Sequence, residues 1–333
     1  MGQKRSWIAV EGRPVGEMLE RLGLVETGEF DFGGDMGPCA AELDGWAVVV
    51  ANGDFDYATA ARLQALSAAG EAVCGRTWDT VMVSAAEGWR EGRRVWSVTH
   101  NLDKDVRNLA VEGEAPSALA EIAERQGRLQ DEAEAAGDEV DHLFEVPTGL
   151  SGAVCGFDPE GGRLPPETAW RAVEPVRTGK AGEAQAALRA YRERFTALVR
   201  SRLFPAAEAL GFEPAGRHPD YLRYHRFGAM NVLVRLRGER AEIIELNWSV
   251  SDNAPFVAIR FFVVEGGVFR AGAPGVAFVP NRPSLLQRLT GRKLDEAAAP
   301  AEVERGLTLL AAVDRHLRDG SAQPNLHPAL YAA

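Results

Sequence analysis

The sequence contains no apolar run long enough to span a membrane, and it contains few cysteines. No segment approaches the roughly 18 consecutive apolar residues of a membrane helix, and the N-terminal stretch becomes charged after a few apolar residues, unlike a secretory signal. Cys39, Cys74 and Cys155 are odd in number, far apart and without CxxC spacing, which argues against a disulfide framework and a zinc site. We therefore expect a cytoplasmic protein that does not bind membranes and whose thiols are free and buried.

Signatures of cofactor binding are also missing. The glycine-rich stretch 29–38 has neither the GxGxxG order of a dinucleotide loop nor the GxxxxGK order of a phosphate loop. Asp54 and Asp56 could begin a calcium loop, but the later ligands and the glutamate at the twelfth position are absent. Turn and helix N-cap chemistry explains these two residues more simply. The sequence thus predicts no cofactor and favours a protein without enzymatic activity.

The formal charge of −11 is divided unequally along the 333 residues. Residues 1–165 contain 14 Lys/Arg and 30 Asp/Glu, a charge of −16, whereas residues 166–333 contain 23 and 18, a charge of +5. An acidic half repels nucleic acid and attracts a basic protein partner, although an ordinary solvated surface has the same composition. The basic residues of the second half are scattered, so we expect no nucleic-acid binding.

Alternating patterns predict an α+β fold. The stretch 81–100 reads as a β-hairpin in which Trp96, Val98 and His100 share one face, and strand-like and helix-like segments alternate around it. The length exceeds that of a typical single domain. We predict two domains, each a mainly antiparallel sheet covered by helices: an acidic α+β domain at 1–158, a Gly/Pro-rich linker at 159–183 and an α+β domain at 184–333. Trp170 indicates that part of the linker docks onto a domain.

The second half predicts four antiparallel strands at 221–226, 230–236, 242–250 and 256–264. They lie between a long helix at 184–210, which Pro205 should kink or break, and helices at 284–289 and 300–317. Alternation assigns one sheet face to the core. The opposite face could collect polar residues that bind a small ligand or a partner, or it could simply be solvated: Arg223, Arg235, Glu245, Asn247 and Arg260.

A motif in the second half carries a resemblance. A helix ending in RSRLFPAAEALGF is followed by YLRYHRF, MNVLVRLRG and IIELNWSVS. This order resembles a family of uncharacterised bacterial α+β domains, a domain of unknown function, with Leu203-Phe204-Pro205 and Leu210-Gly211-Phe212 matching its LFP…LGF pattern. The resemblance covers roughly residues 188–265 and implies a helix packed on an antiparallel sheet, without known chemistry. The first half resembles no characterised family.

Three functional hypotheses follow. The leading one is a non-enzymatic protein-binding module, immunity-like in kind, whose acidic first domain docks a basic partner. A second is a metal-assisted hydrolase, which requires His100 to converge with Asp103, Asp105 or His142. The third is a small-ligand sensor that uses the polar sheet face of the second domain. The sequence indicates no particular oligomeric state.

Overall fold

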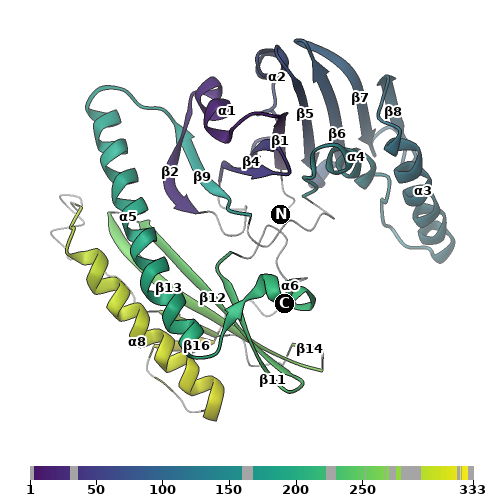
Figure 1. Cartoon of the computed structure of the whole chain (residues 1–333). Helices are drawn as coiled ribbons and strands as arrows, with labels where there is room; N and C mark the ends of the chain where they lie inside the picture. Colours follow the sequence, from purple (N-terminus) through teal and green to yellow (C-terminus); the bar gives the residue numbers. More distant parts are fainter. Residues whose placement is uncertain are drawn as a thin grey trace. The chain divides into compact units, whose positions relative to one another are not determined.

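The computed structural model divides the chain into two compact units (Figure 1). The first unit holds residues 4–25 and 37–176, and the second holds residues 26–30 and the described residues from 177 onward. Each unit contains an antiparallel sheet with helices, so the fold is α+β, as the sequence predicts. The structure describes residues 4–30, 37–159, 168–222, 230–251, 253–266, 268–269, 275–278, 294–320, 323 and 325–328.

The first unit is built around a sheet of strand order β2-β9-β3-β4-β1-β5-β6-β7-β8. The last residues of β2 belong to the second unit. The elements are β1 (Lys4–Glu11), α1 (Val15–Leu22), β2 (Leu24–Phe30), β3 (Cys39–Leu43), β4 (Trp46–Asn52), α2 (Ala60–Ser67), β5 (Glu71–Trp78), η1 (Asp79–Val81), β6 (Val83–Arg90), β7 (Arg93–Asn101), β8 (Leu109–Gly113), α3 (Ala118–Ala136), α4 (Glu145–Cys155) and β9 (Arg171–Pro175).

The predicted hairpin is present as β6 and β7. Glu91 and Gly92 form its turn with φ values of 51° and 72°, the positive values that a two-residue type I′ turn requires. Trp96 and Val98 on β7 are buried together in the core, as the alternation predicts. The hairpin therefore positions the side chain of His100, which follows on the same face.

Helices cover both faces of this sheet. On one face Ile122 of α3 and Leu150 of α4 belong to the buried cluster that contains Trp96 of β7. On the other face α1 and α2 pack over β1, β4 and β5 (Figure 1). Trp170 is buried and its ring lies 5.4 Å from that of Phe157. The docking predicted for this tryptophan is therefore present.

The segment predicted as a linker is structured where it is described. Ala172 in β9 pairs with Cys39 in β3, and α5 already begins at Gly179. The chain passes from the first unit to the second between Val176 and Arg177. The glycine and proline content of this segment predicts a linker, but it does not reveal that the short strand β9 lies between β2 and β3 in the sheet.

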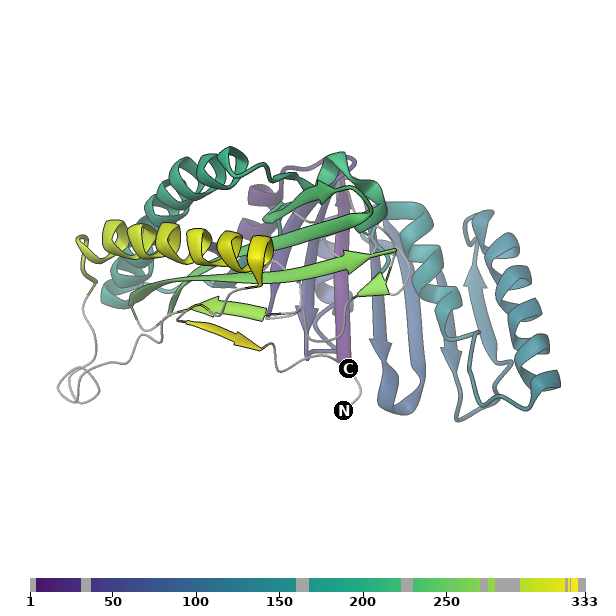
Figure 2. The same ribbon diagram turned by 90° about the horizontal axis from the view of Figure 1, so that it is seen from below.

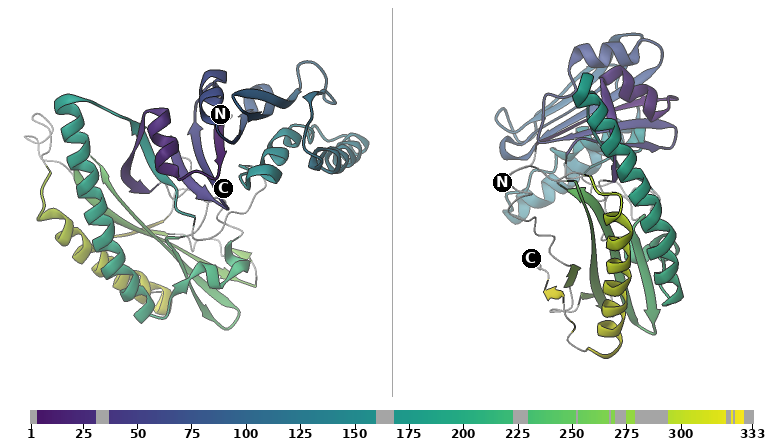
Figure 3. Two further views of the ribbon diagram at one scale, coloured as in Figure 1. Left: turned by 45° about the horizontal axis from the view of Figure 1, so that its top comes forward. Right: turned by 90° about the vertical axis from the view of Figure 1, so that its left-hand side faces the viewer.

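The second unit contains a sheet of order β10-β11-β12-β13-β15-β16, with β14 paired to β13. Helices α5 and α8 lie side by side on one of its faces (Figure 3). The elements are α5 (Gly179–Ala209), β10 (Glu213–Pro214), η2 (Ala215–Arg217), α6 (Pro219–Leu222), β11 (Val232–Arg237), β12 (Arg240–Ser251), β13 (Ala254–Glu265), β14 (Val268–Phe269), β15 (Gly275–Phe278), α8 (Ala298–Asp319) and β16 (Leu326–Pro328).

Three of the four strands predicted for this unit match β11, β12 and β13. The prediction at 221–226 is wrong where it is described, since Tyr221 lies in α6, and the residues after 222 lie outside the described chain. The helix predicted at 284–289 also lies outside it. Helix α5 continues past Pro205 to Ala209, so the proline does not break it.

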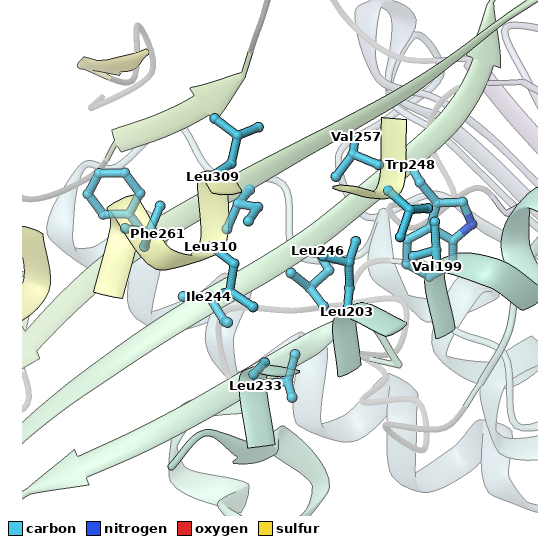
Figure 4. Close-up of a cluster of buried hydrophobic side chains, with 14 of the residues drawn as sticks. Val199, Leu203, Leu233, Ile244, Leu246, Trp248, Val257, Phe261, Leu309 and Leu310 are labelled. Carbon is cyan, nitrogen blue, oxygen red and sulfur yellow. The ribbon is translucent and has the colours of Figure 1, made fainter. Parts of the chain in front are cut away.

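The core of the second unit lies between its helices and its sheet. Figure 4 shows Val199 and Leu203 of α5 meeting Leu246 and Trp248 of β12, with Leu310 of α8 completing the cluster. All five side chains are nearly or fully buried. Burial of a large aliphatic or aromatic side chain stabilises a fold by about 1.5–3 kcal/mol, so this cluster anchors both helices.

The three cysteines are free and buried, as predicted. Burial raises the pKa of Cys74 to about 12, although Arg76 nearby lowers it. A thiol with this pKa stays protonated at neutral pH and is therefore a poor nucleophile. None of the described helices is both long and apolar enough to cross a membrane.

A buried carboxyl group joins α8 to the sheet. Glu302 Oε1 accepts a hydrogen bond from the Val257 N–H (2.9 Å), and Oε2 lies 3.0 Å from Arg305. Burial raises the pKa of Glu302, while the hydrogen bond and Arg305 lower it by less. The contribution of Glu302 to stability is therefore fully present below its pKa in the unfolded chain, and it is lost as pH rises through its raised pKa in the folded protein.

Glu302→Gln should consequently gain stability relative to the wild type as pH rises from about 4 to about 7, because the variant has no charge to desolvate. The free energy of unfolding in urea, measured across this range, tests the expectation. Glu304→Gln, at an exposed position of the same helix, is the matched control and should follow the wild type. A constant difference between Glu302→Gln and the wild type at every pH would contradict it.

Candidate functional sites

His100 lies at the end of β7 with its side chain fully buried. Its Nδ1 is 2.8 Å from the backbone oxygen of Asn108, and its Nε2 is 2.8 Å from Oδ2 of Asp141. A carbonyl oxygen only accepts, so Nδ1 carries a hydrogen. The second hydrogen bond joins Nε2 to a carboxyl group that is itself almost fully buried.

This pair fastens the α3–α4 connection to the sheet. Asp141 Oδ1 also accepts a hydrogen bond from the Phe144 N–H (3.2 Å) just before α4. Both ring nitrogens of His100 are used and none of its surface reaches solvent. The role of His100 is therefore structural, because neither ring nitrogen is free to bind or to act on a substrate.

The other residues of the hydrolase hypothesis do not join His100. Asp103 and Asp105 are exposed in the turn after β7, where Asp105 Oδ1 accepts a hydrogen bond from the Arg107 N–H (2.7 Å). His142 is half-buried, and its backbone N–H donates to Gln130 (2.9 Å). Within the described ranges no three His, Cys, Asp or Glu side chains are grouped to hold a metal. The convergence that this hypothesis requires is thus absent among these residues.

Part of the predicted polar surface is found on the second sheet. Glu245 of β12 pairs with Arg260 of β13 at 2.9 Å, and Asn247 follows on the same face, opposite α5 and α8. Asn247 Oδ1 accepts a hydrogen bond from Asn231 (3.3 Å). Arg223 lies outside the described residues. A role of this face in ligand binding stays a prediction.

Arg235 lies on the opposite face, so its assignment to the polar surface is wrong. The register pairs Leu233 with Ile244 and Arg235 with Glu242, which places Arg235 under the helices. The cause is local: β11 is apolar on both faces around Leu233, so alternation alone cannot tell which face is core.

Arg235 is instead the centre of a buried ionic network. Its Nε donates to Glu242 (2.7 Å), and its Nη1 donates to Asp314 of α8 (2.6 Å) and to the Leu210 oxygen (2.8 Å). The side chains of Arg235, Glu242 and Asp314 are 7%, 0% and 2% exposed. The guanidinium also stacks over the ring of Phe212 at 4.3 Å. These contacts connect α5, the sheet and α8, which is a structural role.

Negative charge is concentrated at one end of the first unit. Residues 109–145, which we call the acidic end, contain eleven Asp/Glu and two Arg, a formal charge of −9 within a total of −11. They form β8, α3 and the start of α4, and α3 lies beside β8 in Figures 1 and 2. Helix α3 buries only a narrow stripe of side chains around Ile122. Its other positions face solvent, where charged side chains are readily accommodated.

Some of these carboxylates are already neutralised. Arg107 pairs with Asp131 (2.6 Å) and Glu134 (2.8 Å), and Arg94 pairs with Glu112 (2.6 Å). The exposed carboxylates that make no hydrogen bond or ion pair with any described residue are those of Glu114, Glu121, Glu132, Asp138 and Glu139. The sequence shows the acidic helix, but it gives no signal for β8, a short strand with mostly exposed residues.

No protein-family model, curated protein or solved structure matches this chain.

Proposed function

We propose that this chain is a non-enzymatic cytoplasmic binding protein, immunity-like in kind, whose acidic end docks a basic protein. The observation that carries the proposal is the charge of −9 within residues 109–145, together with exposed carboxylates that have no partner among the described residues. Such a concentration of negative charge creates an electrostatic field that steers a positively charged protein toward it.

The carboxylates without partners are the ones available to a ligand. Glu121 and Glu132 on α3 are exposed and unpaired among the described residues, whereas Asp131 and Glu134 already share Arg107. A basic partner can add new ion pairs with the first two without breaking an existing one. A phosphate backbone or an anionic membrane would be repelled by the same charges.

For the second half we propose membership of the uncharacterised α+β family that it resembles. The packing of the matched residues supports this proposal. Leu203 and Phe212 are buried, and α5, which carries Leu203, lies on an antiparallel sheet. This proposal adds no chemistry to the docking function.

A capture experiment tests the docking function. The tagged protein is incubated with lysate of its own organism at low and moderate salt, and retained proteins are identified by mass spectrometry. A stoichiometric basic protein should be retained at low salt and lost as salt rises, because salt screens exposed charges. The double variant Glu121→Lys/Glu132→Lys should retain at most about a tenth of it.

The matched control reverses two exposed carboxylates elsewhere in the same unit. Glu20→Lys/Glu42→Lys changes the net charge by the same amount but lies outside the acidic end. It should retain the partner at the wild-type level. If both double variants lost the partner equally, binding would depend on net charge alone. If neither double variant changed the amount of partner retained, the acidic end would be excluded as the docking surface.

A further inference from the structure

β8 is the outermost strand of the first sheet, and no described strand pairs with its outer side. It pairs only with β7, with Val111 opposite Val98. In an antiparallel pair, successive residues alternately direct their backbone groups toward the partner strand and away from it. One edge of β8 is therefore left with backbone donors and acceptors that β7 does not use.

Two hydrogen bonds identify these backbone groups. Leu102 N–H donates to the Met82 oxygen (3.2 Å) on the β6 side of β7, and Glu114 N–H donates to the Val95 oxygen (3.3 Å) on the β8 side. From Trp96 to Asn101, even-numbered residues of β7 thus bond to β6 and odd-numbered residues bond to β8. The β8 residues that bond to β7 are Ala110, Glu112 and Glu114, and those that point outward are Leu109, Val111 and Gly113.

The side chains along this edge have a distinct chemistry on each face. Val111 faces the α3 side and is 46% exposed. Glu112 faces the opposite side, where its side chain is 69% exposed and pairs with Arg94 at 2.6 Å. An incoming strand would therefore meet an apolar contact on one face and an exposed ion pair on the other.

A second copy of this chain is a poor occupant of the edge. Pairing β8 with itself would bring two acidic ends, each of charge −9, against one another. Charged residues at an edge strand are a known device against such self-pairing. The same charges favour a strand that carries lysine or arginine.

We propose that an extended basic segment of the partner adds to β8 as a further strand. Its backbone bonds to the outward groups of Val111 and its neighbours, an apolar side chain covers Val111, and a lysine or arginine shares the Glu112 carboxylate with Arg94. Main-chain bonding to an exposed edge, with alternate side chains giving specificity, is an established mode of peptide recognition. This inference rests on the proposed function for the charge of the partner, and it adds the mode of binding.

The probe is an eight-residue peptide of alternating lysine and valine, added to the full-length protein. Amide hydrogen exchange of Val111 and Gly113 should slow by about tenfold or more at saturating peptide, because their N–H groups gain acceptors. A peptide of alternating glutamate and valine should leave this exchange unchanged. The protein variants Val111→Pro and Val111→Ala separate backbone from side-chain effects.

Val111→Pro removes one outward N–H without touching the β7–β8 ladder, so the sheet should persist. We expect it to weaken peptide binding by at least about tenfold relative to Val111→Ala, which has lost the same side-chain contact but keeps the N–H. Circular dichroism and thermal unfolding of the two variants confirm that both are folded.

Two results would overturn the inference. One is equal affinity of the lysine peptide for the two Val111 variants, and the other is unchanged exchange at the β8 edge. If Glu121→Lys/Glu132→Lys still weakens binding in that case, the docking function stands and only strand addition fails. If that double variant has no effect while the edge is protected, strand addition stands and the acidic docking surface fails.

Discussion

Replacing His100 by alanine should lower the free energy of unfolding of the first unit by about 2–4 kcal/mol, because it leaves a cavity and removes the hydrogen-bond partner of the buried Asp141 carboxyl group. The pair lies 2.8 Å apart with side-chain exposures of 0% and 7%. The loss should appear first in α4, since Asp141 also caps the Phe144 N–H. Hydrogen exchange of the Val146 and Leu150 amides, combined with urea unfolding, measures it.

His142→Ala is the matched control. His142 lies in the same connection, is half-buried, and uses its backbone N–H rather than its ring in the hydrogen bond to Gln130. Its replacement should change stability by less than about 1 kcal/mol. Equal losses in the two variants would show that the His100–Asp141 pair does not hold the connection to the sheet.

Replacing Arg235 by methionine should destabilise the second unit by about 3 kcal/mol, because it leaves two buried carboxylates, Glu242 and Asp314, without their central cation. Arg240 and Arg318 still reach these carboxylates, which limits the loss. Methionine fills a similar volume, so the effect reports the charge rather than a cavity. Urea unfolding followed by the exchange of α8 amides measures it.

The ion pair of Arg202 with Glu304 provides the control. Its N–O distance of 2.6 Å equals that between Arg235 and Asp314, but the side chains are 49% and 60% exposed. Arg202→Ala should therefore reduce stability by less than about 1 kcal/mol. If Arg235→Met had an equally small effect, the buried network would not hold α8 to the sheet.

Alternation predicts a sheet face only where one face is polar. In β7 and β12 apolar residues alternate with polar ones, and Trp96 and Leu246 lie in the core as predicted. In β11 both faces are apolar, and the prediction for Arg235 failed for that reason. The decisive information is the pairing of Arg235 with Glu242, a property of two strands that one strand's pattern does not contain.

The features that position the acidic end are also non-local. β8 is five residues long with one partly buried position, so it has little hydrophobic periodicity to detect. The partner of His100 lies 41 residues further along the chain. The sequence indicates His100 as a candidate, but only the folded sheet and the α3–α4 connection bring it to Asp141 and leave Asp103 and Asp105 exposed.

The most direct test of the docking function is the association rate constant with the captured partner, measured against ionic strength for the wild type and both charge-reversal double variants. Steering by the acidic end predicts a wild-type rate that falls steeply with salt. At low salt Glu121→Lys/Glu132→Lys should associate about tenfold more slowly, while Glu20→Lys/Glu42→Lys should stay close to the wild type. An association rate that is independent of salt and equal in all three proteins would contradict the account.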